Sequence, residues 1–187
     1  MRVLETELPG VLVVEPAVHR DARGFFLETY HEPRYRAHGI AARFVQDNYS
    51  ASTRGTLRGL HGQSPHPQAK LVRVVCGEIW DVAVDVRLGS PCFGRHAAAV
   101  LSAENFRQLF VPPGVLHGFC VLSERAEVEY KCSEVYDPSA DFGVRWNDPE
   151  LAIPWPIAEP LLSEKDRSAP FLREVRERLI PYAPPGA

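Results

Sequence analysis

Turn-forming residues recur along the whole chain and separate short runs of β-branched and aromatic residues. The 187 residues include 17 prolines and 13 glycines, and turn signals return about every ten residues. This spacing suits short strands joined by turns and does not suit the strand–helix alternation of a βαβ fold. It predicts a mainly β sandwich or barrel. Strands are expected at residues 11–14, 24–30, 43–48, 56–61, 70–75, 78–86, 97–101, 108–111, 117–122 and 126–135.

Few segments have the pattern of a helix or a tight hairpin. Residues 70–75 and 78–86 flank Cys76 and Gly77, which predicts a hairpin. Residues 32–38 are expected to form one or two helical turns. In residues 170–179, apolar side chains fall at helical spacing behind a proline suited to the first helical position, so a short helix is expected there.

Size, charge and cysteine usage exclude several classes of protein. The length fits a single domain over residues 1–187, and the net charge of −3 gives no basic surface for nucleic acid or for an anionic membrane. We find no apolar run of the ~20 residues that a membrane span needs and no signal peptide at the start. The four cysteines form no C-x-x-C pair, so we expect reduced thiols and a cytoplasmic protein.

The segment of residues 57–63, followed by residues 68–73, gathers an imidazole, a guanidinium and an ammonium. His61 has the side chain whose ordinary pKa lies nearest neutrality, so it can accept a proton. The cations of Arg58 and Lys70 could stabilise an enolate or bind a phosphate. The residues alone leave open a bland alternative, which is a basic surface turn with a hydrogen-bonded histidine.

Two patterns of alternation place polar groups inside the predicted sheets. Tyr130 shares a strand face with apolar residues, while the charged residues of that strand lie on the other face, so its phenol is expected to point inward. Whether it packs or lines a cavity stays open. Asp81 and Asp85 lie among apolar residues, so they either meet water or pair with Lys70 or Arg73; we expect at least one pair.

Ordered motifs extend over nearly the whole chain. They are residues 21–28, 44–48, 57–61, 68–73, 81–87, 89–91, 101–105, 113–119, 129–132, 145–149 and 162–166. In this order they resemble the dTDP-4-dehydrorhamnose 3,5-epimerase family of nucleotide-sugar biosynthesis. The resemblance implies a cupin-like (jelly-roll) antiparallel β-barrel with a few short helices, one near the C-terminus. It also implies a homodimer that uses no metal and no organic cofactor.

The resemblance further implies a reaction and a set of site residues. The substrate would be dTDP-4-keto-6-deoxy-D-glucose, inverted at C3 and C5 to dTDP-4-keto-L-rhamnose in dTDP-rhamnose biosynthesis. His61 matches the catalytic base, Asp166 the carboxylate that orients it, Tyr130 the acid on the opposite face and Lys70 the cation near the C4 oxygen. Positions that hold the nucleotide, diphosphate or sugar match Arg23, Glu28, Gln46, Asn48, Arg58 and His117. A ketone at C4 acidifies C3 and C5, so a base, an acid and a cation are the groups that this chemistry needs.

Two of these residues have alternative roles. Residues 163–166 read as an S-x-x-D capping box, in which Asp166 would cap a helical turn instead of reaching His61. His117 stands where cupins often hold a metal, but Gly62 and Gln63 break the usual H-x-H pair. Three ligands cannot be assembled, so we expect no metal.

One departure from the family pattern lies beside the base. The family commonly has an aromatic residue after its histidine, and this chain has Gly62; Val135 also replaces a frequent aromatic, next to Tyr136. The missing ring is expected to widen the sugar pocket or loosen its loop. This leaves open an epimerase that inverts only one carbon of a related 4-keto sugar. A non-catalytic sugar-nucleotide binder and a metal-dependent oxygenase are weaker alternatives.

Overall fold

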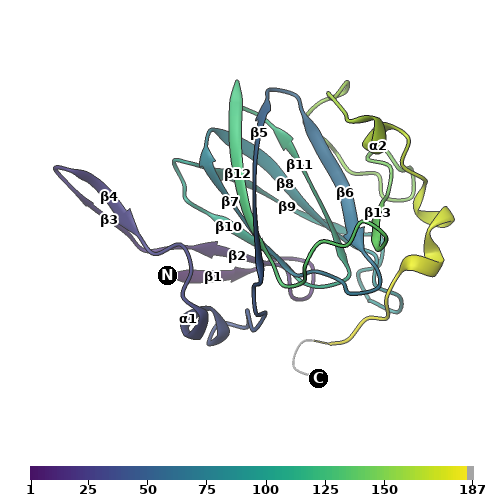
Figure 1. Cartoon of the computed structure of the whole chain (residues 1–187), viewed down its shortest axis with the longest axis horizontal. Helices are drawn as coiled ribbons and strands as arrows, with labels where there is room; N and C mark the ends of the chain where they lie inside the picture. Colours follow the sequence, from purple (N-terminus) through teal and green to yellow (C-terminus); the bar gives the residue numbers. More distant parts are fainter. Residues whose placement is uncertain (185–187) are drawn as a thin grey trace.

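Two antiparallel sheets face each other in the computed structural model, which describes residues 1–184 (Figure 1). In spatial order, the six strands of the first sheet are β1 (Arg2–Glu5), β2 (Leu12–Glu15), β10 (Gln108–Val111), β7 (Lys70–Cys76), β12 (Arg125–Cys132) and β5 (Gln46–Thr53). Those of the second are β13 (Asp141–Gly143), β6 (Leu57–Gln63), β11 (Val115–Val121), β8 (Glu78–Asp85) and β9 (His96–Ser102).

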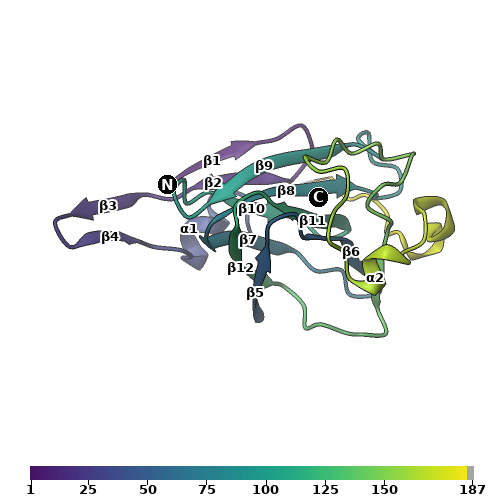
Figure 2. The same ribbon diagram turned by 90° about the horizontal axis from the view of Figure 1, so that it is seen from above.

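A separate hairpin extends away from both sheets. It consists of β3 (Val18–Asp21) and β4 (Gly24–Leu27), and both views show it projecting to the side opposite β6 (Figures 1 and 2). The described helices are short: α1 (Glu32–Arg36), α2 (Glu164–Arg167) and two 3-10 turns, Leu172–Glu174 and Arg176–Arg178. None of them is long and apolar enough to cross a membrane.

Three apolar clusters hold the layers together. The central one lies between the sheets and joins residues such as Val72 and Val128 of the first sheet to Ile79 and Phe119 of the second. A second cluster packs the C-terminal segment on the outer face of the second sheet, and a third packs α1 and its neighbours on the outer face of the first. The clusters therefore fill the space between the sheets, apart from the region where polar residues replace the central cluster, and cover part of each outer face.

The mainly β, jelly-roll-like architecture expected from the sequence is confirmed, with corrections of detail. The sheets face each other without closing into a continuous barrel. The hairpin expected around Gly77 is wrong: β7 and β8 belong to different sheets, and the chain turns a corner between them. Gly77 has φ +76°, and a Cβ there would lie 2.0 Å from the carbonyl oxygen of Arg125. The corner thus requires glycine for both conformation and space.

Several elements differ from the sequence-based expectation in type or in bounds. Residues 170–179 form the two 3-10 turns instead of one α-helix, because Val175 between them has φ −120°. Strand β5 begins at Gln46, three residues after the expected start, and continues to Thr53. The short strands β1, β3 and β13 were not predicted.

The buried carboxylates do find partners, but not the predicted lysine or arginine of β7. Asp81 bonds to His117 at 2.6 Å, and Asp85 receives two hydrogen bonds from the Arg87 guanidinium at 2.7 and 2.9 Å. Ser90 donates a third to Asp85 at 2.6 Å. Burial opposes ionisation of Asp85, but these bonds outweigh it and hold its pKa below the ordinary value.

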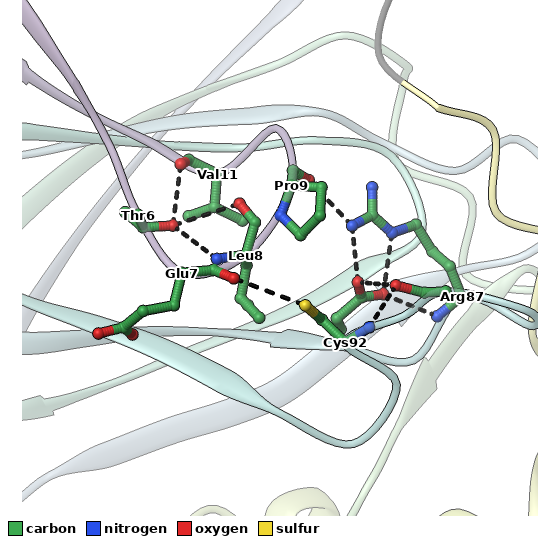
Figure 3. Close-up of polar contacts among 9 residues, drawn as sticks. Thr6, Glu7, Leu8, Pro9, Val11, Arg87 and Cys92 are labelled. Carbon is green, nitrogen blue, oxygen red and sulfur yellow. Dashed lines mark hydrogen bonds and ion pairs between the residues drawn. The ribbon is translucent and has the colours of Figure 1, made fainter.

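Arg87 also ties the N-terminal turn to this buried pair. Its Nη2 donates to the carbonyl oxygen of Pro9 at 3.0 Å, and Cys92 nearby donates to that of Glu7 (Figure 3). The Arg87 side chain is 6% exposed and that of Asp85 is fully buried. The turn between β1 and β2 is therefore fixed to the end of β8.

Arg87→Met is expected to destabilise the fold by about 3–5 kcal/mol, because it leaves the Asp85 carboxylate buried without its cation. Urea unfolding followed by circular dichroism measures this. Arg2→Met, which removes an exposed ion pair to Glu15, is the control and should cost less than ~1 kcal/mol. Equal, small losses in both variants would contradict the assignment.

Candidate active site

Polar side chains from both sheets line one cavity of about 300 Å³ near one end of the sandwich. Strand β6 contributes His61, β7 contributes Lys70 and β12 contributes Tyr130, while Gln46 and Asn48 come from β5. Lys70 shares a strand face with Val72, and Tyr130 shares one with Val128, so the pleat turns both inward toward the central cluster. The structure thus brings together five of the ten site residues expected from the sequence, with a sixth, Asp166, bonded to His61 behind them.

The histidine and the aspartate are hydrogen-bonded. His61 Nε2 lies 2.5 Å from Asp166 Oδ1, and the Asp166 side chain is 5% exposed while that of His61 is 30% exposed. Because an ionised carboxylate only accepts, the bond places the ring proton on Nε2 and leaves Nδ1 with a free lone pair. The pair therefore has one buried end and one end that can take a proton.

Helix α2 supplies the aspartate, and half of the predicted capping box holds it there. Ser163 is the N-cap, and its hydroxyl accepts the N–H of Asp166 at 3.1 Å. The Asp166 carboxylate does not complete the box but reaches His61. Burial would raise the pKa of Asp166, yet the hydrogen bond from His61 and the nearby charges outweigh it and lower this pKa. The carboxylate stays ionised at neutral pH.

Lys70 and Tyr130 lie side by side on the opposite sheet from His61. The Lys70 Nζ is 5.9 Å from the centre of the Tyr130 ring, and it has no hydrogen bond or ion pair to any residue within 1–184. Burial lowers the pKa of Lys70 and raises that of Tyr130. The phenol therefore keeps its proton at neutral pH, and the Lys70 amino group, whose charged form burial disfavours, would gain a partner in a ligand's negative oxygen.

Further residues line the cavity that the motif analysis did not assign to the site. They are Gln63, Gln68, Tyr136, Asp141 and Lys165. Lys165 pairs with Asp141, which also accepts a hydrogen bond from the Tyr136 hydroxyl at 3.3 Å. Lys165 adjoins Asp166 in sequence, which was a usable signal, whereas Asp141 lies on the short strand β13 and gave none.

The predicted binding residues Arg23 and Glu28 lie away from this cavity. Arg23 is at the tip of the projecting hairpin, with its side chain 90% exposed and paired to Asp21 (Figure 1). Glu28 follows β4 and pairs with Arg34 of α1 at 2.6 Å. Within a single chain, therefore, neither residue lines the cavity that contains His61.

Arg58 and His117 also lie outside the cavity lining. Arg58 borders a separate groove with Ser52 and Arg125, and its Nε donates to Ser52 at 3.1 Å. His117 stands opposite His61 in the register of β6 and β11, but it is buried and bonded to Asp81. Across residues 1–184, no three His, Cys, Asp or Glu side chains gather in a way that could hold a metal.

The chain matches proteins of known activity over most of its length. The model of the family described as dTDP-4-dehydrorhamnose 3,5-epimerase matches residues 5–174. The dTDP-4-dehydrorhamnose 3,5-epimerase of Shigella flexneri is 51% identical over 168 residues, which cover 89% of this chain and 93% of that one. This chain belongs to that family. Its members are carbohydrate epimerases, which are isomerases.

Solved structures of epimerases have the same fold. One is dTDP-6-deoxy-D-glucose-3,5-epimerase from Legionella pneumophila in complex with dTDP-4-keto-L-rhamnose; it is 46% identical, covers 97% of this chain and 98% of that one, and has a TM-score of 0.94. Another is a 3'-monoepimerase from Streptomyces bikiniensis in complex with dTDP-quinovose, which is 36% identical with a TM-score of 0.88 and covers 95% of this chain and 92% of that one.

Gly62 departs from the common family pattern, and the structure corrects the expectation of a wider pocket. A Cβ at Gly62 would lie 2.7 Å from Leu116 Cδ2 and 3.0 Å from two ring carbons of Phe142. Phe142 of β13 is the cross-strand partner of Gly62. The space that a side chain at position 62 would enter is thus already filled from the neighbouring strands.

Gly62→Phe is expected to destabilise the protein by about 1–3 kcal/mol through overpacking against Phe142. Combining it with Phe142→Ala should relieve the clash. The double variant is therefore expected to be at least ~1 kcal/mol more stable than the sum of the single effects predicts. Urea unfolding of all four proteins measures this coupling; strictly additive effects would contradict it.

Proposed function

We propose that this protein epimerises dTDP-4-dehydro-6-deoxy-D-glucose at C3 and C5, giving dTDP-4-dehydro-L-rhamnose in the biosynthesis of dTDP-rhamnose. The observation that carries the proposal is the shared cavity, in which an Asp166-bonded His61 lies with the phenol of Tyr130 and with the Lys70 amino group, which has no partner among residues 1–184. Family membership over residues 5–174 supports the same reaction. We place the reaction in the cytoplasm, which the four free cysteines support.

The proposed chemistry begins at the free nitrogen of His61. Nδ1 removes the proton from C3, and the electron pair of the broken C–H bond moves into the C4 carbonyl to give an enolate. Lys70 stabilises the negative oxygen at C4. Asp166 stabilises the imidazolium that forms and keeps the ring in the required orientation.

Tyr130 completes each inversion from the other face. Its hydroxyl donates a proton to the carbon, the electron pair returns from the oxygen to re-form the C4 ketone, and solvent restores both side chains. The raised pKa of Tyr130 keeps the donor protonated before this step. The same sequence at C5 inverts the second carbon. Acid–base catalysis of this kind contributes about 10²–10⁴-fold in rate.

The nucleotide end of the substrate needs more residues than one chain brings to the cavity. Gln46 and Asn48 lie in the cavity wall, and Arg58 in the separate groove offers a cation for the diphosphate. Arg23 and Glu28 are also proposed to bind the substrate, from the hairpin of a second copy in a homodimer. The exposed Phe25 and Phe26 on that hairpin, 55% and 71% exposed, support its burial against another chain. His117 is proposed to support the sugar site from beneath.

A single-carbon epimerase is the second candidate. The likeness to the Streptomyces bikiniensis monoepimerase at 36% identity favours it, because one fold carries both activities. The two functions share the base, the acid and the enolate, and they differ only in how many carbons exchange hydrogen.

Incubation with the 4-keto sugar nucleotide in D₂O is expected to place deuterium at both C3 and C5, as NMR or mass spectrometry would show. Label at one carbon alone would support the monoepimerase, and no label would refute both. His61→Ala should abolish exchange while keeping dTDP affinity. Tyr130→Phe should reduce inversion more than exchange, because deprotonation precedes its step.

Mixing two inactive variants tests the homodimer and the role of its hairpin. Arg23→Ala and His61→Ala are each expected to lower kcat/KM by at least tenfold. In mixed dimers one of the two sites carries neither lesion, so activity should recover after the subunits exchange. Two copies of one variant, unfolded and refolded in the same way, serve as the control. No recovery in a dimer of confirmed mixed composition would contradict a hairpin that acts on the partner's site.

A further inference from the structure

Gln63 ends the motif that carries the proposed base, yet neither the motif nor the proposed chemistry gives it a role. It is the last residue of β6, two positions after His61, and it is 6% exposed. A primary amide carries two donor hydrogens and an acceptor oxygen, and burying them without partners is costly. The position of its partners therefore indicates what this side chain holds.

The amide of Gln63 connects the two loops that border the cavity. Its Nε2 donates to the carbonyl oxygens of His66 at 2.7 Å and Val135 at 3.3 Å. Its Oε1 accepts the N–H of Asp137 at 3.0 Å. His66 lies between β6 and β7, while Val135 and Asp137 lie between β12 and β13. Three hydrogen bonds from one buried group thus join these loops.

Tyr136 stands between the two anchored residues of the second loop. Its own N–H donates to Gln46 Oε1 at 2.8 Å, and Gln63 bonds to the backbone of the residues on either side of it. Two glutamine side chains therefore hold the backbone at three consecutive residues. The ring is half exposed and borders the cavity, with its hydroxyl on Asp141. Side chains of β5 and β6 therefore fix the backbone that carries this aromatic ring.

We infer that Gln63 is a positioning residue that acts through Tyr136. It holds this ring at the edge of the cavity, where the ring packs against the bound sugar nucleotide and restricts the substrate's escape. The inference rests on the proposed function. Gln63 makes no hydrogen bond to His61 or Asp166 within the described chain, and that pair is held by β6 and the cap at Ser163. Gln63 therefore governs substrate affinity more than proton transfer.

Gln63→Met tests the inference, because methionine has the same length and none of the hydrogen bonds. We expect KM for the 4-keto sugar nucleotide to rise roughly tenfold, from the loss of bonds that order the loop, with kcat changed by less than about threefold. Thr6→Val is the matched control. Thr6 also makes three hydrogen bonds to loop backbone, in the distant N-terminal turn (Figure 3). Removing these bonds by Thr6→Val should leave KM unchanged.

The decisive measurement repeats Gln63→Met in a Tyr136→Ala background. If Gln63 acts through this ring, the substitution should change KM by less than about twofold there. An equal rise in both backgrounds would show that the effect does not pass through Tyr136, and would overturn the inference. An unchanged KM in Gln63→Met, with only the melting temperature lowered, would overturn it too.

Two further measurements keep the test conclusive. If Gln63→Met does not fold, Gln63→Glu keeps the length and the acceptor for the Asp137 N–H while losing both donors; we expect KM to rise about threefold, and an unchanged KM overturns the inference. Wild-type exchange in D₂O is measured first. Failure there would refute the proposed function, whereas an active wild type with an unaffected Gln63 variant would refute only the role of Gln63.

Discussion

The hydrogen bond between His61 and Asp166 is the contact on which the proposed chemistry depends, and it requires distant parts of the chain to meet. The two residues are 105 positions apart. The C-terminal segment must cross the outer face of the second sheet before α2 can present its carboxylate to β6. Packing on that face, through residues such as Leu151 and Trp155, therefore contributes to the orientation of the base. In this fold the apolar cluster on the outer face of the second sheet supports the proposed active site.

The inner layer changes character along the length of the sheets. At one end the facing strands bury only apolar side chains, while at the other Lys70, Tyr130 and His61 take the same pleat positions. Asp81 and His117 lie between these regions and bond to each other, so a polar pair sits under the cavity. A sandwich tolerates these groups because each is hydrogen-bonded or faces the cavity, although among residues 1–184 Asp81 Oδ2 is buried without a partner. The cavity thus forms where polar side chains occupy inward positions that apolar side chains fill elsewhere between the sheets.

The sequence predicted the strand content well where alternation was strong and failed where contacts between distant segments decide. Tyr130 was placed inward correctly, because charged residues on the other face of β12 leave only one arrangement. The prediction of a hairpin at Gly77 was wrong because β7 and β8 join different sheets. Whether two consecutive strands pair depends on the sheets that they join, and the local sequence pattern does not contain this information. Likewise, the local sequence around Asp166 favoured a cap, and only the family resemblance favoured a catalytic partner. The position of β6 relative to α2 decides between them.

The binding residues show the same limit in another form. Motif matching assigned Arg23, Glu28 and Arg58 to the ligand as readily as Gln46 and Asn48, since a motif contains no distances. The structure separates the two groups: the β5 residues line the cavity, whereas the hairpin extends away from it (Figure 2). A hairpin that exposes two phenylalanines beside an arginine is poorly suited to water. Its composition fits a surface that another copy of the chain covers, so the proposed site would be complete only in the assembled protein.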